Sequence, residues 1–486
     1  MAMNHLEIER KYDADADFAV PEMDGLPGVA ETEPPKVHRL SATYFDTEDQ
    51  RLASYGITLR RRRGGEDAGW HLKIPAGPDS RNELRAPLGR AQVVPAKLAG
   101  LVAAYVRGAS LRPIAVLETV RTEIRLLDDR GVPLAELADD LVTGRVMGQD
   151  GESSWREVEV ELGEAGGLDF LKAAEKRLKK AGARPASSGS KLGRLLGREP
   201  DEVRKGGDTA GDAVVGYLAE QVAALLRYDP RARLAEFDAV HRMRVATRRI
   251  RSALQSYRAI VDRKHTDEVR AELKWLAEEL GAVRDLEVLR MHFTARLEEV
   301  GEPAEQDWLK SIGRHEEAAY RRLNVVLKEP RYFALLDALD ALVAEPPLTE
   351  RAEKGATVEL PKLVKRSWKR LVKAHRAVAN AEHVEEARHE MRKSAKKARY
   401  AAELAVPVLG QAAKDVAKNA KRVQEVLGDY QDGVIAMDHL RDAATRVTER
   451  SEAFTIGVLY GVERCEALRS ISKLEATWEE TSPPSF

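Results

Sequence analysis

Three charged residues near the start of the chain have the types and spacing of a site for phosphates and metal ions. Glu7, Glu9 and Lys11 alternate with apolar residues such as Leu6 and Ile8. In an extended strand successive side chains point to opposite faces, so the two carboxylates and the ammonium group share one face. Carboxylate oxygens suit Mg²⁺ or Mn²⁺, and an ammonium group suits a phosphate oxygen. The run forms a site if later segments supply its other walls.

Later segments repeat this alternation with other charges. Up to about residue 165 the sequence predicts short strands separated by turns, each with one apolar face and one densely charged face. Lysine and arginine come from the middle strands, whereas glutamates come from the first and last strands. These charged positions are Arg60, Arg62, Lys73, Arg121, Arg125, Glu157, Glu159 and Glu161.

Two arrangements of these strands fit the alternation. An open antiparallel sheet would expose its charged face to water. A closed barrel would turn the charges into a lumen and pack the apolar faces outward against helices. The separate basic and acidic groups favour the barrel, because such a lumen suits a polyphosphate chain and its metal ions.

The composition limits the classes of protein that fit. A chain of 486 residues is too long for one core, so two or three domains are expected. The 79 lysines and arginines nearly balance the 80 aspartates and glutamates, so any basic site must be local. Cys465 is the single cysteine, the N-terminus is charged, and no apolar run approaches the ~20 residues of a membrane span. We expect a cytoplasmic protein with no membrane partner.

The first part of the chain resembles the CYTH domain of the triphosphate tunnel metalloenzymes. The resemblance covers residues 3 to about 198, and several motifs occur in the order of that family. The matching motifs are Glu7-x-Glu9-x-Lys11, Tyr44-Phe45-Asp46-Thr47, Leu59-Arg60-x-Arg62, Leu72-Lys73, Glu157-x-Glu159-x-Glu161 and, after a helix from Leu168 to Ala181, Ser190-Lys191-Leu192. The resemblance implies a closed antiparallel β-barrel over residues 1–198. Members of the family hydrolyse inorganic triphosphate or thiamine triphosphate, and some cyclise ATP.

Carried over position by position, the resemblance implies a role for each charged residue. The catalytic set would be Glu7, Glu9 and Lys11. The ligands of Mg²⁺ or Mn²⁺ would be Glu7, Glu9, Glu157, Glu159, Asp139 and Glu161. The residues holding the triphosphate would be Lys11, Arg60, Arg62, Lys73, Arg121, Arg125 and Lys191. Because phosphoryl transfer depends mainly on positioning and charge stabilisation, such a tunnel needs no covalent nucleophile.

The sequence changes character after residue 198. Residues 199–211 are polar, contain glycine and lack a period, which is typical of a linker. From about residue 212 the apolar period is close to 3.6, which predicts amphipathic helices. We therefore expect a second domain over residues 212–475, followed by a C-terminal tail over residues 476–486.

The helical part repeats itself. The segment His241 to Arg251 matches His389 to Arg399, which lies 148 residues further along the chain. The pair Leu280-Gly281 matches Leu427-Gly428 at an offset of 147 residues. Two matches at nearly one offset predict two duplicated helical bundles.

Each repeated segment carries a stripe of basic residues. On a helix, His241, Arg244, Arg248 and Arg251 share one face, and the second copy repeats the pattern. Like charges four residues apart destabilise a helix by ~0.2–0.5 kcal/mol per pair. A stripe present in both copies despite this cost favours an anionic partner; the alternative is a solvated basic face.

The doubled segment resembles the CHAD domain, an α-helical domain often found after CYTH. The resemblance covers residues 212 to about 475 and implies binding of inorganic polyphosphate on a basic surface between two four-helix bundles. The matching positions are His241, Arg244, Arg248, Arg249, Arg251, Arg284, His389, Arg392, Lys393, Lys396, Lys397 and Arg399. Nucleic acid is a weaker candidate, because binders of single strands usually interleave aromatic residues for base stacking, and neither stripe does.

These observations predict an α+β protein of two domains, a closed antiparallel β-barrel followed by two duplicated helical bundles. The first hypothesis is a metal-dependent inorganic triphosphatase with an attached polyphosphate-binding domain. The second is a thiamine triphosphatase or a class IV-type adenylate cyclase, which would need an apolar subsite that the sequence does not locate. The third is a non-enzymatic polyphosphate-binding protein associated with polyphosphate granules, and the intact set of Glu7, Glu9 and Lys11 argues against it.

Overall fold

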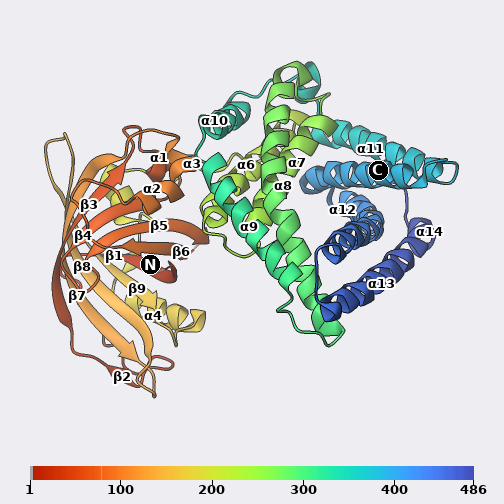
Figure 1. Ribbon diagram of the computed structural model, residues 1–486. Coiled ribbons are helices and arrows are strands. Elements are labelled where there is room, and N and C mark those ends of the chain that lie inside the picture. Colours follow the sequence, from red (N-terminus) through yellow and green to blue (C-terminus); the bar gives the residue numbers. More distant parts are fainter. Residues whose placement is uncertain (1–3, 78) are drawn as a thin grey trace. The chain divides into compact units, whose positions relative to one another are not determined.

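The structure is a computed structural model that describes residues 4–77 and 79–486. The chain divides into two compact units, Met1–Glu202 and Val203–Phe486 (Figure 1). The boundary between them lies within the stretch that the sequence predicts as a linker.

The first unit is a closed antiparallel β-barrel of eight strands, as the sequence predicts. Around the barrel the order is β1, β6, β5, β4, β3, β7, β8 and β9, and β9 pairs with β1 to close it. These strands are β1 (Asn4–Ala14), β3 (Lys36–Asp46), β4 (Thr58–Arg63), β5 (Gly69–Gly77), β6 (Ser80–Ala86), β7 (Arg112–Leu127), β8 (Pro133–Val146) and β9 (Ser153–Leu162). Two short strands, β2 (Glu31–Thr32) and β10 (Arg184–Pro185), pair with β7 and β1.

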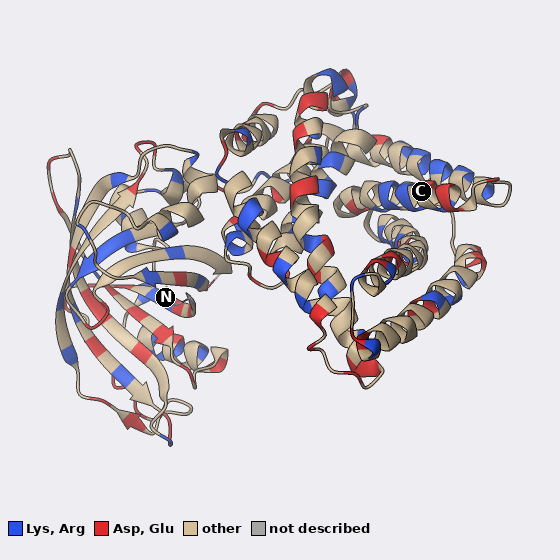
Figure 2. Ribbon diagram, in the orientation of Figure 1, with Lys and Arg blue, Asp and Glu red and all other residues tan. Residues whose placement is uncertain are grey.

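The barrel is apolar on the outside and charged on the inside. On β9, Val158 and Val160 are fully buried against Phe170 and Leu171 of α4 (Leu168–Lys180). The residues that alternate with them must point to the other side, into the barrel. Figure 2 shows both signs of charge along the strands. The alternation of apolar and charged residues along each strand therefore gives the barrel an outer face that packs against helices and an inner face that lines the lumen.

A short helix brings a lysine to the lumen. α5 (Lys191–Leu196) follows Ser190, whose hydroxyl accepts a hydrogen bond from a backbone amide in the first turn. Leu192 packs in a buried cluster with Leu117 of β7. This anchorage leaves the Lys191 side chain buried against the charged lumen.

Three small helices complete the first unit. They are α1 (Arg51–Ser54), α2 (Ala96–Leu101) and α3 (Ala103–Val106). Asp46, at the end of β3, is fully buried and accepts hydrogen bonds of 2.8 and 2.9 Å from two backbone amides of α1. The aspartate of the Tyr44 to Thr47 motif therefore fixes the chain reversal after β3.

The second unit is built from helices. In chain order they are α6 (Ala210–Arg233), α7 (Ala239–Ser256), α8 (Arg263–Glu299), α9 (Asp307–Val326), α10 (Pro330–Ala344), the 3₁₀ helix η1 (Glu350–Glu353), α11 (Ala356–Val378), α12 (Val384–Ala444), α13 (Arg450–Ser472) and α14 (Leu474–Glu479). α12 consists of two helices joined at Gly410, whose backbone is not helical (φ 58°, ψ −131°). In the described part of the chain no helix has the length and apolar character that crossing a membrane requires.

The helices occur in two copies with the same order. α6, α7, α8 and α9 correspond to α11, the first half of α12, its second half and α13. Successive helices of each copy pack on one another, and α7 also packs on α12. Gly410 therefore stands where the first copy has the loop between α7 and α8. The duplication inferred from two short matches extends over four helices in each copy.

The end of the chain packs on the second copy. The sequence predicts a tail from residue 476, but α14 already includes that position. The Trp478 ring stacks on that of His375 in α11, with centroids 4.0 Å apart, and lies nearly parallel to Trp368 at 6.3 Å. The helical unit therefore continues beyond residue 475.

Candidate functional sites

The barrel encloses a cavity of about 350 Å³ with a mostly charged lining. Six elements that are distant in the sequence, namely β1, β4, β5, β7, β9 and α5, bring the predicted residues together there. The predicted residues in the lining are Glu7, Glu9, Lys11, Arg60, Arg62, Lys73, Arg121, Arg125, Glu159, Glu161 and Lys191.

Ion pairs connect the first strand with its neighbours across the lumen. The Glu7 carboxylate lies 2.6 Å from the Lys73 ammonium group. Lys11 Nζ lies 3.0 Å from a Glu9 oxygen and also donates a hydrogen bond to Glu159, its partner in register on β9. The first motif of the sequence is thus joined directly to the last one.

Three carboxylates of β8 and β9 form a buried cluster. One oxygen from each of Asp140, Glu157 and Glu159 lies within 4.8 Å of the others. Lys191 Nζ contacts these three side chains at 2.9, 2.7 and 2.8 Å. Burial acts to raise the pKa of Glu159, but Lys11 and Lys191 outweigh it and hold the pKa well below its ordinary value. The two lysines therefore keep the Glu159 carboxylate ionised.

The structure corrects the metal ligand predicted at Asp139. This residue is paired in register with Val158, which packs outward, and its carboxylate accepts hydrogen bonds of 2.9 and 2.8 Å from Arg156. Asp140 is fully buried and accepts hydrogen bonds of 2.8 and 2.7 Å from Arg121. Because neighbours in a strand point to opposite faces, Asp140 enters the lumen and Asp139 does not.

The arginines of the lumen have unused hydrogen-bond donors. The Nε atoms of Arg60 and Arg62 are buried and lack a hydrogen-bond partner among residues 4–77 and 79–486. Burial, and then the nearby Arg60 and Arg121, lowers the pKa of Arg62 to about 9. An unpaired buried donor costs about 1–3 kcal/mol, so an anion that accepts these hydrogen bonds would be held strongly.

A second group of carboxylates in the lumen has too few cationic neighbours to offset the cost of burying their negative charges. Burial raises the pKa of Glu7 to about 7 and that of Glu161 to about 6, and it raises the pKa of Glu136 as well. Glu161 is paired in register with both Glu9 and Glu136. A divalent cation among these oxygens would supply the missing positive charge, so the residues fit Mg²⁺ or Mn²⁺.

Several charged residues of the lumen were not predicted. Glu83 is fully buried and lies 2.7 Å from His71 and 3.8 Å from Lys73, so it helps to position that lysine. The charged strand residues of the lining that are missing from the predicted set are Arg81, Glu83, Arg85, Glu123 and Glu136. The sequence did contain a signal for these residues, because each lies on the charged face of a strand in which charged and apolar residues alternate.

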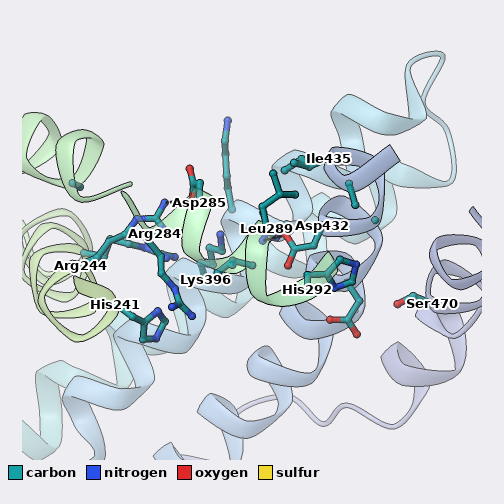
Figure 3. A pocket seen from close by; sticks show the side chains of 18 of the residues that line it. His241, Arg244, Arg284, Asp285, Leu289, His292, Lys396, Asp432, Ile435 and Ser470 are labelled. Carbon is teal, nitrogen blue, oxygen red and sulfur yellow. Dashed lines mark ion pairs between the residues drawn. The ribbon is translucent and has the colours of Figure 1, made fainter. Parts of the chain in front are cut away.

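The helical unit contains a larger cavity of about 1290 Å³ (Figure 3). Residues of α7, α8, α12 and α13 line it. The predicted basic residues in this lining are His241, Arg244, Arg248, Arg251, Arg284, Arg392, Lys393, Lys396 and Lys397. The stripes of the two copies therefore meet around one cavity.

The two copies place one arginine in the same way. Arg244 lies 3.6 Å from Asp285, and Arg392 lies 3.7 Å from Asp432. Each guanidinium lies against the glycine of the repeated Leu-Gly pair. The Nε atom of each is buried and has no hydrogen-bond partner in the described residues. The duplication thus preserves two buried donors beside the cavity.

The positive charges of this cavity destabilise one another. Burial, and then Arg248 and Arg392, lowers the pKa of Lys396 to about 7. Burial also lowers the pKa of Arg244 and of Arg251. An anion in the cavity would remove this repulsion.

Three residues of the predicted polyphosphate set do not line the cavity. Arg249 and Arg399 donate hydrogen bonds of 3.2 and 2.7 Å to Glu403, and so connect α7 with α12. His389 is exposed near the start of α12. Glu403 pairs with both arginines and so gives them a structural contact, and their predicted role in binding polyphosphate stays a prediction.

Comparisons with known proteins agree with this architecture. Residues 5–195 match the family model of the CYTH domain, and residues 216–441 match that of the CHAD domain. The Mycobacterium tuberculosis protein named Uncharacterized protein Rv2226 is 38% identical over 499 residues, which cover 97% of this chain and 95% of that protein. The chain belongs to the family in which a CYTH domain is followed by a CHAD domain.

Solved structures resemble each unit separately. The crystal structure of the CHAD domain from the plant Ricinus communis is 22% identical, with a TM-score of 0.47, and the match covers 58% of this chain and 95% of that one. The putative adenylyl cyclase HpAC1 from Hippeastrum is 18% identical, with a TM-score of 0.24, and the match covers 41% of this chain and 97% of that one.

Proposed function

We propose that the barrel hydrolyses inorganic triphosphate to pyrophosphate and phosphate with Mg²⁺ or Mn²⁺, and that the cavity of the helical unit binds inorganic polyphosphate. The observation that carries the first part is the lumen of about 350 Å³, where Arg60 and Arg62 have Nε donors without a partner in the described residues and carboxylates share the lining. Leu40 is the sole aliphatic side chain in the described lining. A thiazole, pyrimidine or adenine ring would find little apolar surface there, which favours an inorganic substrate.

The residues of the lumen divide the work of phosphoryl transfer. Arg60, Arg62 and Arg121 hold phosphate oxygens by charge-assisted hydrogen bonds, and Lys11 and Lys73 add point charges. The candidate metal ligands are Glu7, Glu9, Glu157, Glu159 and Glu161, to which the structure adds Glu136 and Asp140. A bound metal ion would neutralise phosphate oxygens and acidify the attacking water. Positioning and charge stabilisation supply most of the catalysis in such reactions.

Phosphate release tests the first part of the proposal. The wild-type protein should release phosphate from triphosphate faster than from ATP or thiamine triphosphate, and only with Mg²⁺ or Mn²⁺. Glu9→Gln and Lys11→Ala should abolish turnover without lowering the thermal unfolding midpoint. Glu118→Gln is a matched control, because Glu118 is exposed on the outside of the barrel. Wild-type turnover by either lumen variant, or a cyclic nucleotide product from ATP, would contradict the proposal.

Salt dependence tests the second part. Polyphosphate has no bases, so it should be held by lysine and arginine with strong dependence on salt. The double variant Arg244→Ala/Arg392→Ala should weaken binding of long polyphosphate and reduce the slope of log K against log salt by about two. Arg321→Ala, 72% exposed on α9, should change neither. Equal binding of single-stranded DNA of the same charge would instead support a general polyanion binder.

A further inference from the structure

The cavity of the helical unit has two ends that differ in chemistry (Figure 3). Arg244, Arg284 and Lys396 lie together at one end. Leu289 and Ile435 lie toward the other end, where α8, the second half of α12 and α13 line the cavity. Arg296 and Arg469 also line the cavity, so the hollow has cations along both ends, and an exposed apolar residue, Ile435, occurs among them.

The apolar end is built from equivalent positions of the two copies. Val288 on α8 and Ile435 on α12 are 147 residues apart, which is the offset of the repeat, and both line the cavity. They are 39% and 44% exposed. His292 and His439 form a second equivalent pair in the same lining. Single exposed aliphatic residues need no explanation, but a symmetric pair inside one cavity indicates a ligand surface.

Inorganic polyphosphate offers no apolar group to the aliphatic residues of this end. Every unit of that polymer is charged, so Val288 and Ile435 gain nothing by facing it. Asp285 and Asp432 lie beside the cationic residues, with side chains 73% and 63% exposed and their arginine partners 3.6 and 3.7 Å away. Their carboxylates are free to accept hydrogen bonds from uncharged donors such as hydroxyl and amino groups.

We propose that this cavity also binds nucleoside polyphosphates, with the phosphates on the cationic end and the nucleoside between Val288 and Ile435. In this arrangement Asp285 and Asp432 accept hydrogen bonds from the ribose hydroxyls or from an exocyclic amino group. The inference rests on the proposed function, because it uses the same arginines to hold the phosphates. It adds a class of ligand that carries an organic group.

The dimensions of the two cavities agree with this assignment. Pockets for small organic ligands usually enclose about 300–1,000 Å³ and combine apolar walls with a few polar groups. The cavity of about 1290 Å³ has room for a nucleoside next to its phosphates. The lumen of the barrel, at about 350 Å³, lies near the lower limit of that range, and Leu40 is the sole aliphatic side chain in its described lining.

Calorimetric titration of the full chain with ADP and with pyrophosphate tests the inference. The two ligands share a diphosphate and differ in the nucleoside, and omission of divalent metal prevents turnover in the barrel. ADP should bind about tenfold more tightly than pyrophosphate, as expected for burying two aliphatic side chains. Val288→Ser/Ile435→Ser should abolish this preference and leave binding of pyrophosphate and long polyphosphate unchanged. Val325→Ser/Val358→Ser, at residues 63% and 55% exposed outside the cavity, is the matched control.

Three results of these titrations would overturn the inference. Equal affinities of the wild-type protein for ADP and pyrophosphate, no binding of ADP, or a preference that survives in Val288→Ser/Ile435→Ser would overturn the inference. If the double variant loses stability, Ile435→Thr keeps the branched shape and should still reduce the preference. Failure of long polyphosphate to bind, with the ADP preference intact, would refute the proposed polyphosphate function and leave the nucleotide site standing.

Discussion

Lys396 should make the binding of polyphosphate depend on pH. Its pKa is lowered to about 7, first by burial and then by Arg248, Arg392 and Arg244, while Asp432 acts in the opposite direction. A polyanion in the cavity would cancel the repulsion and return the pKa toward the ordinary value of about 10.4. Binding is therefore accompanied by uptake of about one proton above pH 7.

The size of the effect follows from these two pKa values. Below about pH 6 Lys396 is charged in both states, so the affinity does not change. Above pH 7 the free protein must first take up a proton, and the affinity falls by about tenfold per pH unit. Between pH 6 and pH 8 this amounts to about tenfold, or ~1.4 kcal/mol.

The assay measures the affinity for long polyphosphate at pH 6, 7 and 8 at constant salt, because long chains have few titrating ends. Lys396→Arg should remove most of the pH dependence, since a guanidinium stays charged throughout. Lys393→Arg should keep the wild-type profile, because Lys393 is 49% exposed and paired with Glu390. His241 also faces the cavity, but burial and Arg284 lower its pKa, which moves its titration away from the pH 7 to 8 interval where Lys396 has its largest effect. An identical profile in wild type and Lys396→Arg would refute the reasoning.

Stability of the free protein should respond to the same group with the opposite sign. In the unfolded chain Lys396 keeps its proton up to about pH 10, whereas in the folded protein it loses the proton near pH 7. The unfolded state therefore binds more protons between these values, and the free energy of unfolding rises with pH there. Urea unfolding at pH 6 and pH 8 should show that the stability of wild type relative to Lys396→Met rises with pH, since the other titrating groups are common to both proteins.

Three further predictions concern other charged groups. Because burial raises the pKa of Glu7 to about 7, its carboxylate becomes ionised as the pH rises through that value. The affinity for Mg²⁺, measured by titration, should therefore rise over the same pH range, and Glu7→Gln should abolish this rise. Asp140→Asn should lower triphosphate turnover by about 10²-fold while Asp139→Asn leaves it unchanged, and the reverse order would restore Asp139 to the site. Glu403→Ala should lower the free energy of unfolding by about 1–2 kcal/mol, as two arginines lose a partner, yet change polyphosphate affinity less than twofold. A larger gain of affinity would place the released arginines on the ligand.

The barrel could be predicted because its alternation of charged and apolar residues is long and regular. Glu7, Glu9 and Lys11 are two residues apart in one strand and therefore share a face whichever strands pair with it, so their common face could be predicted from the sequence alone. The choice between Asp139 and Asp140 could not be made in this way. Register decides which of two adjacent residues enters the lumen, and register depends on hydrogen bonds to strands elsewhere in the sequence.

The internal repeat of the sequence predicted the two copies of the helical unit, but it did not predict which basic residues of each stripe line the cavity. The equivalent residues Arg244 and Arg392 repeat in sequence and in structure, including their buried Nε atoms. Arg251 lines the cavity, whereas Arg399, at the equivalent position, is held by Glu403. Glu403 occupies the position of a neutral glutamine in the first copy, so a single acidic residue broke the symmetry that the stripe implied.

A common physical device underlies both candidate sites. In each, burial lowers the pKa of one cation, Arg62 in the lumen and Lys396 in the helical cavity, and neighbouring arginines lower it further. In each, buried Nε donors lack a hydrogen-bond partner within the described ranges. Such groups destabilise the free protein, and an anion that pairs with them recovers that free energy on binding. A chain with a net charge of −1 can therefore bind polyanions strongly, because the local arrangement of cations matters more than the overall charge.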